Sequence, residues 1–222
     1  MSLPTNKRRF LPAKKTLLQV MAGIAVMAIL VLKFVDGFLA VTQPVGEGIL
    51  AVEAWIPAKP LEESAKVFQS GRYRYLVLVG GPMGDAGQES AGSASFAELA
   101  AGRLEKIGFD ANKIVKISDT DEKLGHTLGG ATAVARWLES SGTHVCCVDV
   151  FTVGVHARRS WALFRYALGD RYRVGVIAGP QVTYDPNRWL VSRRGIWIVS
   201  RNLAGLLYVK LWILLHGKAT SG

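Results

Sequence analysis

The feature that most constrains the fold is a regular alternation between short apolar runs and longer segments with helical periodicity. Residues 75–79 form a continuous apolar run that ends at a Gly-Gly-Pro turn, which is typical of a parallel strand buried on both faces. Segments with strand character also lie at 49–53, 113–117, 145–150 and 173–178, and helical patterns separate them at 59–69, 96–107, 128–140 and 160–168. This alternation predicts right-handed βαβ units, and therefore an α/β, Rossmann-like parallel sheet of about five strands with helices on both faces.

An apolar segment precedes this domain. No residue from 16 to 32 is charged, the apolar character continues to about residue 41, and roughly 20 such residues suffice to cross a bilayer as a helix. Five basic residues and no acidic one come before it, at positions 7, 8, 9, 14 and 15. Because Lys and Arg beside a span favour the cytoplasmic side, we expect a cytoplasmic N-terminus at 1–15 and a transmembrane signal anchor at 16–41. A cleaved signal peptide is the alternative, although residues 40–42 fit a small-x-small cleavage site poorly.

The rest of the chain is expected to form a linker at 42–48, one α/β domain at 49–217, and a tail at 218–222. The domain would then lie outside the cytoplasmic membrane of a single-pass protein. Residues 195–215 are strongly apolar, but Arg201, Asn202 and Lys210 interrupt them. A second span would carry charged residues at a cost of about 2.5–3.5 kcal/mol each. We therefore expect a helix that packs on the domain and touches the membrane surface, with a second span as the alternative.

The net charge of +10 is distributed unevenly along the sequence. Residues 1–15 carry +5, residues 16–155 carry −4, and residues 156–222 carry +9. No stripe of alternating aromatic and basic residues accompanies this charge, so nucleic acid is not an expected partner. A basic final third could instead hold an anionic ligand or contact anionic lipid headgroups.

The two cysteines, Cys146 and Cys147, are adjacent. If both lay in a strand, their side chains would point to opposite faces and a disulfide between them would be strained. They also lack the ligand spacing of a zinc site. The sequence therefore predicts two buried, reduced thiols, and no metal centre, because the four histidines are scattered.

The densest group of candidate functional residues follows the fourth expected strand. His156, Arg158 and Arg159 lie where a turn leads into the next helix, and a helix N-terminus with Arg beside it can bind phosphate or carboxylate. The other segments at the carboxyl ends of the strands begin at Glu53, at Gly80 and at Ser118, and such ends meet at one edge of a parallel sheet. No Gly-x-Ser-x-Gly elbow, P-loop or Gly-x-Gly-x-x-Gly fingerprint is present, which disfavours serine hydrolysis and classical NAD binding.

Several short motifs match one family pattern across most of the domain. They are Glu53 with Trp55, Gly80-Gly81-Pro82, Ser95 with Ala97-Glu98-Leu99, Thr127 with Ala131 and Trp137-Leu138, Thr152 with His156 and Arg158-Arg159-Ser160, Val174-Gly175-Val176, Tyr184-Asp185, and Trp189. On these residues the chain resembles the SanA/YdcF/ElyC-like family of bacterial envelope proteins. The family usually has Arg where this chain has His126, and an imidazole replaces an Arg charge only when it is protonated.

The resemblance implies a Rossmann-like, membrane-anchored domain at the cytoplasmic (inner) membrane, linked to cell-envelope or peptidoglycan-related processes. It leaves the reaction, the cofactor and the oligomeric state undefined. We expect a phosphate-bearing ligand, such as a nucleotide or a lipid-linked saccharide, which the protein either acts on as an enzyme or binds as a non-catalytic module. The candidate catalytic residues are His156 and Glu98, and the candidate ligand-binding residues are Glu53, Gly80, Gly81, Ser95, His126, Thr127, Thr152, Arg158 and Arg159. For two of them a helix-terminal role is the alternative: Glu98 as a charge in the first helical turn, and Thr127 as an N-cap.

Overall fold

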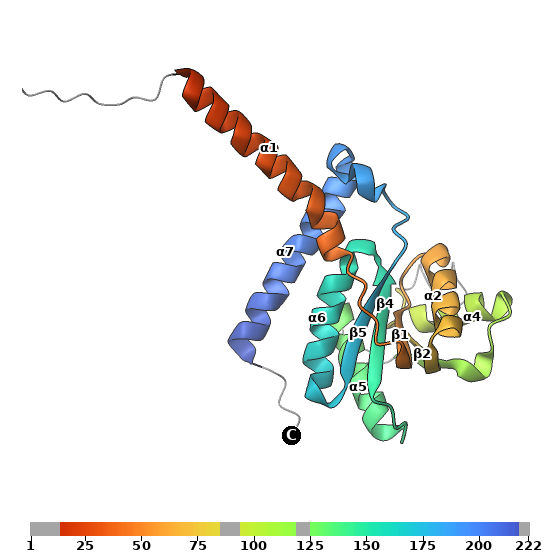
Figure 1. Cartoon of the computed structure of the whole chain (residues 1–222). Coiled ribbons are helices and arrows are strands. Elements are labelled where there is room, and N and C mark those ends of the chain that lie inside the picture. The colour runs from red at the N-terminus through yellow and green to blue at the C-terminus, as the bar shows by residue number, and fades with distance from the viewer. Residues whose placement is uncertain (1–13, 85–93, 119–124, 218–222) are drawn as a thin grey trace, which may run out of the picture. The chain divides into compact units, whose positions relative to one another are not determined.

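The computed structural model describes residues 14–84, 94–118 and 125–217 (Figure 1). The chain divides into two compact units, residues 1–35 and residues 36–222. Three segments that we discussed from the sequence lie wholly or partly outside the described residues. They are the basic residues at 7–9, part of the segment that begins at Ser118, and the tail at 218–222.

The first unit consists of most of helix α1, Lys14–Leu39, whose last turn from residue 36 belongs to the second unit. Its apolar side chains are exposed: Leu17, Leu18, Met21, Ile24 and Met27 each keep more than half of their surface accessible. The helix therefore presents an apolar surface along its length, which is unfavourable in water.

The second unit is built on a five-stranded, all-parallel sheet, which confirms the predicted architecture. The strands are β1 (Glu47–Glu53), β2 (Arg72–Val79), β3 (Ile114–Ile117), β4 (Cys147–Val153) and β5 (Arg173–Gly179). They lie in the order β3-β2-β1-β4-β5, so the order reverses between β1 and β4. The carboxyl ends of these two strands therefore open onto a crevice.

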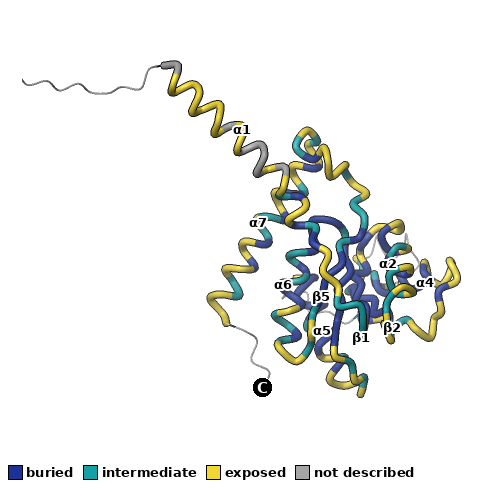
Figure 2. Tube along the Cα trace, viewed as in Figure 1, coloured by how far each residue is buried: buried dark blue, intermediate teal, exposed yellow. Residues whose placement is uncertain are grey.

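Helices cover both faces of the sheet. Helices α2 (Ala58–Ser70) and α4 (Phe96–Lys106) bury one face against side chains such as Leu50 and Leu78. Helices α5 (His126–Ser140) and α6 (Ala157–Leu168) bury the other face against Ala51 and Val150. The central strands β1 and β4 are accordingly buried over most of their length, whereas the edge strand β3 is less buried (Figure 2). Short 3-10 turns occupy Ala111–Lys113, Gly154–His156, Gly169–Arg171 and Pro186–Val191.

The final helix, α7 (Arg193–His216), packs against α6 and the start of α5. Val199, Leu206 and Val209 are buried on its inner side, whereas Leu214 and Leu215 are more than two thirds exposed on its outer side. Within the described ranges, α7 is the helix whose length and apolar composition would allow it to cross a membrane. Its contacts with the domain agree with the packed helix that we expected.

Residues 36–46 lead into the domain along its edge. The Tyr184 hydroxyl donates to Asp36 Oδ1 at 2.5 Å, and the Arg158 side chain donates to the Phe38 carbonyl and lies over the Phe38 ring. Gln43 then pairs antiparallel with Val176 of β5 before β1 begins. The chain therefore enters this unit beside the N-terminus of α6, at the carboxyl end of the sheet.

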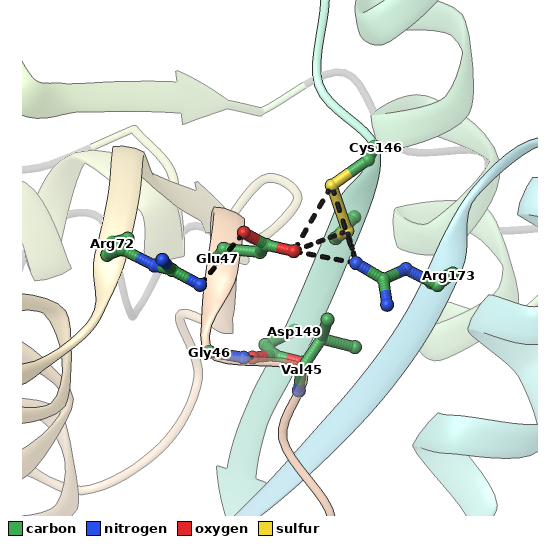
Figure 3. Close-up of a disulfide and its surroundings, with 8 residues drawn as sticks. Val45, Gly46, Glu47, Arg72, Cys146, Asp149 and Arg173 are labelled. Atoms are coloured by element: carbon green, nitrogen blue, oxygen red, sulfur yellow. Dashed lines mark hydrogen bonds and ion pairs between the residues drawn. A yellow bond between two sulfur atoms is a disulfide. The ribbon is translucent and has the colours of Figure 1, made fainter.

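The prediction of two buried, reduced cysteines is wrong. Cys146 and Cys147 form a disulfide between adjacent residues, and no free thiol is present (Figure 3). The reason is that β4 begins at Cys147, so Cys146 lies outside the strand and is exposed, and the alternation of side chains within a strand does not apply to this pair. Both sulfur atoms lie near Glu47 and Arg173, at the amino ends of the strands.

Candidate functional site

A pocket of about 280 Å³ lies at the carboxyl ends of β1 and β4, where the strand order reverses. Mostly polar, glycine and aromatic residues line it, and they come from the ends of β1 and β2, from α4, from the start of α5, from the segment after β4 and from α7. They are Glu53, Trp55, Val79, Gly80, Gly81, Phe96, His126, Thr127, His156, Arg159, Phe164 and Arg201. Seven of the eleven residues that we singled out from the sequence therefore line this pocket: Glu53, Gly80, Gly81, His126, Thr127, His156 and Arg159.

His156 ends the 3-10 turn between β4 and α6, and it is only 7% exposed. The Asn202 side chain donates a hydrogen bond through Nδ2 to the Ile198 carbonyl, so its Oδ1 faces His156 Nδ1 at 3.0 Å. Nδ1 therefore carries the proton and donates a hydrogen bond to Asn202 Oδ1. The lone pair of the neutral imidazole is therefore on Nε2, which faces Thr127 Oγ1 and Arg159 Nη2, each at 3.4 Å. Nε2 is thus the atom that could accept a proton from a ligand.

Burial lowers the pKa of His156 below its ordinary value, and the charges of Arg159 and Arg201 lower it further. Glu53 and the hydrogen bond that His156 donates to Asn202 act in the opposite direction without overcoming burial. The imidazole is therefore neutral at pH 7 and available as a base. The edge of Trp55 covers it, with 5.0 Å between ring centroids.

Glu53, the last residue of β1, is 4% exposed and lies beside the imidazole. Its Oε2 accepts a hydrogen bond from Ser160 at 2.8 Å and is 3.7 Å from His156 Nε2. Its other oxygen, Oε1, is buried and has no hydrogen-bond partner among the described residues. A buried acceptor without a donor is costly, and this one lies at a pocket.

Arg159, in the first turn of α6, is half-buried and forms no ion pair with a described carboxylate. Its Nε is buried and has no acceptor. Burial lowers its pKa, as does the neighbouring charge of Arg201, while Glu53 raises it. The guanidinium lies against α7 at Gly205, where a Cβ atom would be 2.9 Å from Nη1. The charge of Arg159 is thus held in place but only partly compensated, as expected of a group that binds an anion.

The N-terminus of α5 faces the same pocket. Its N-cap is Gly125, with φ of +77°, and no side chain caps the helix, which leaves backbone N–H groups without a capping partner. Thr127 is therefore not the N-cap, and its hydroxyl lies beside His156 instead. His126 is exposed and lines the pocket. The family that the sequence resembles usually has Arg at this position.

Gly80 and Gly81 follow β2 and form a further wall. A Cβ on Gly80 would be 2.7 Å from the Cβ of Phe96, so the close approach of this loop to α4 requires glycine.

Four residues that we expected at the site have other positions. Glu98 is exposed, and its carboxylate accepts a hydrogen bond from the Ala94 N–H, while Ser95 caps α4 by accepting from the Glu98 N–H. Both side chains therefore bind backbone N–H groups at the start of α4, close to the arrangement of a capping box. Arg158 points to Phe38, and Thr152 is fully buried in β4 with an unpartnered hydroxyl.

Three residues that contact or flank His156 or its pocket with polar or aromatic groups were not among our candidates. Asn202 and Arg201 come from the middle of α7, and their only signal was that they interrupt an apolar helix. Trp55 follows β1 and was noted only for its match to the family pattern.

Within the described part of the chain, one group of three His, Cys, Asp or Glu residues has the mutual spacing of metal ligands: Glu47, Cys146 and Cys147. Their sulfur atoms are bonded to each other, and Arg173 Nη2 lies 2.6 Å from Glu47 Oε1 (Figure 3). A cation already occupies the position of a metal, so this group is not a metal centre in its disulfide form.

No family model matches this sequence, and no curated protein matches it either.

Proposed function

We propose that this protein is a membrane-anchored, extracytoplasmic protein of the SanA/YdcF/ElyC type that binds a phosphate-bearing ligand of the cell envelope and acts on it. The proposal rests mainly on one observation: two residues of the same pocket, Glu53 and Arg159, each have a buried polar atom without a hydrogen-bond partner in the described part of the chain. One is an acceptor and the other a donor, and each unsatisfied group costs about 1–3 kcal/mol. A phosphate-bearing ligand with a hydroxyl would satisfy both, because its oxygen atoms accept from Arg159 while its hydroxyl donates to Glu53.

The charges around the pocket support an anion. Among the described residues that line it, Arg159 and Arg201 contribute two cations and Glu53 contributes one carboxylate, and no described side chain caps the N–H groups at the N-terminus of α5. Positive charge and free backbone N–H groups are the usual partners of phosphate.

His156 is the proposed proton acceptor. A ligand hydroxyl or a water molecule next to Nε2 would transfer its proton to that atom as its oxygen attacks the phosphorus of the ligand, and the bond from phosphorus to the leaving oxygen would break. The imidazolium so formed would pair with Glu53, 3.7 Å away, and would return the proton to the leaving oxygen. The hydrogen bond from Nδ1 to Asn202 fixes the tautomer that this step requires.

A second candidate function is a non-catalytic binding module that supports envelope assembly. It is favoured by the burial of His156, both of whose ring nitrogens already have partners within the protein. In that case the imidazole would only position Arg159.

A turnover screen separates the two functions. Full-length protein in detergent would be incubated with phosphorylated saccharides and nucleotides, alongside His156→Ala and the control His144→Ala, whose histidine is exposed in the loop before β4. An enzyme would show turnover that His156→Ala lowers at least a hundredfold and His144→Ala leaves unchanged. Binding without turnover in all three proteins would identify a binding module.

The membrane anchor in this proposal is α1. Its support is the uncharged sequence from 16 to 32, the exposed apolar side chains of the helix, and the preceding basic residues. The disulfide of Cys146 and Cys147 agrees with an oxidising compartment for the second unit.

Reporter fusions test this topology. A reporter that is active only outside the cytoplasm should be active when it is fused after Gly217. A fusion active only in the cytoplasm would overturn this topology.

A further inference from the structure

A second pocket, of about 350 Å³, adjoins the site between α5, α6 and α7. It shares His126, Thr127 and Arg159 with the polar pocket, so the two are continuous. Its remaining lining differs, because apolar and aromatic side chains dominate it. They are Leu128, Leu163, Tyr208, Val209 and Trp212, and Gly125 and Gly205 complete the wall. We call this second pocket the apolar groove.

Helix α7 runs from the polar pocket along the apolar groove. Arg201 lines the polar pocket, and Gly205, Val209 and Trp212 line the groove on successive turns of the same helix face. At the junction, the Arg159 guanidinium lies against Gly205, where the helix carries no side chain. A ligand that follows this face would therefore meet positive charge at one end and hydrocarbon side chains at the other.

The groove opens onto an apolar surface of α7. Leu211, Leu214 and Leu215 are 55%, 78% and 71% exposed, and Tyr208 on the groove wall is 68% exposed. Exposed apolar side chains on one face of a helix in a domain with a basic C-terminal third indicate contact with lipid.

We propose that the ligand of this protein is a lipid phosphate, whose phosphate lies at Arg159 and Arg201 and whose hydrocarbon chain occupies the apolar groove. This assignment rests on the proposed function, since it takes the polar pocket as the phosphate site. It commits to a lipid because Leu163 and Val209 are aliphatic and the groove adjoins exposed leucine side chains of α7, which suit a hydrocarbon chain better than a sugar or a nucleobase. The continuity of the two pockets and the positive charge at their junction carry the inference.

Chain length provides the test. Full-length protein in nanodiscs of neutral lipid would be titrated with inorganic phosphate and with ethyl, butyl, hexyl and octyl phosphate, and empty nanodiscs would serve as the blank. Complete burial of a methylene group contributes about fourfold in affinity, so a chain that is half in contact with the groove should gain about twofold per methylene. From ethyl to octyl phosphate the expected gain is on the order of 60-fold.

Two matched variants locate the chain. Tyr208→Gln removes an exposed aromatic wall of the groove, whereas Leu207→Gln makes a similar change one residue away, at a side chain that does not line the groove. Tyr208→Gln should reduce the gain from ethyl to octyl phosphate several-fold and leave the affinity for inorganic phosphate unchanged. Leu207→Gln should alter neither.

The outcomes distinguish this inference from the proposed function. Binding of inorganic phosphate and ethyl phosphate that depends on Arg159 but does not increase with chain length would overturn the lipid assignment and leave the phosphate site standing. A chain-length gain that is equal in Tyr208→Gln and Leu207→Gln would also overturn it, because the chain would then lie elsewhere. Absence of any phosphate binding that depends on Arg159 would overturn the proposed function itself.

Discussion

Replacement of Arg159 by Ala tests the centre of the proposed site. The guanidinium is half-buried, forms no ion pair with a described residue, and has a buried Nε without an acceptor, so its charge is available to a ligand. A hydrogen bond to a charged group contributes about 1.5–3 kcal/mol, and about 1.4 kcal/mol corresponds to tenfold in affinity. Arg159→Ala should therefore weaken the binding of inorganic phosphate by about tenfold to a hundredfold, as measured by calorimetric titration of the full-length protein.

Two further variants make this test specific. Arg158→Ala removes the same charge from the adjacent residue, which contacts Phe38 instead of the pocket, and should leave the affinity for phosphate nearly unchanged. Arg159→Lys should recover only part of the affinity, because an ammonium group cannot reproduce the two-pronged hydrogen bonding of guanidinium.

The pKa of His156 gives an independent readout in the same samples. Arg159 lowers this pKa, so Arg159→Ala should raise it, and the shift can be followed by NMR titration of the imidazole protons. Because Arg159 has no ion pair to lose, its replacement should change the free energy of unfolding by less than about 1 kcal/mol. If the pKa of His156 rises but phosphate binds as tightly as in the wild type, the anion site is not at Arg159 and the reasoning fails.

The remaining predictions concern stability and the cysteines. The pKa of His156 is lowered in the folded protein, so the unfolded state binds a proton at this histidine at a higher pH than the folded state does. Thermal stability should therefore decrease as the pH falls below about 6.5, and it should decrease less in His156→Gln. An equal loss in both proteins would exclude this histidine as the cause. Asn202→Leu removes the acceptor of the Nδ1 proton, which should cost about 1–3 kcal/mol of stability and lower the pKa of His156 further by NMR, whereas an unchanged pKa would contradict the tautomer assigned above. Native protein should not react with thiol reagents until a reductant is added, after which Cys146 should be labelled before the buried Cys147. Labelling of two thiols per chain in protein that has not been reduced would contradict the disulfide.

The fold was predictable because its elements are encoded locally. The apolar run at 75–79 and the glycine and proline that end it indicate a buried parallel strand, and β2 (Arg72–Val79) contains that run. The boundaries were less predictable where a turn joins a helix. The helix expected from residue 160 begins at Ala157, because the 3-10 turn of Gly154–His156 continues directly into it.

The site was predictable only in its local part. Glu53, His156 and Arg159 were found because strand ends and helix starts can be read from the sequence, and parallel strands bring their carboxyl ends together. Asn202 was not, because its contact with a residue 46 positions earlier depends on how α7 packs on α6, which no short-range pattern encodes. Glu98 lies outside the pocket, which the sequence did not indicate, because a carboxylate in a first helical turn looks the same in sequence whether it caps the helix or faces a ligand.

The bond between Cys146 and Cys147 differs from most structural disulfides in what it encloses. A disulfide usually stabilises a protein by restricting the unfolded chain, and the effect grows with the length of the loop that it closes. Here the two residues are already neighbours, so the cross-link removes almost none of the freedom of the unfolded chain. Reduction should therefore leave the global stability of the domain nearly unchanged. Its effect should be confined to the charge and reactivity of the region around Glu47 and Arg173, at the amino ends of the strands and thus at the opposite end of the sheet from the ligand pocket.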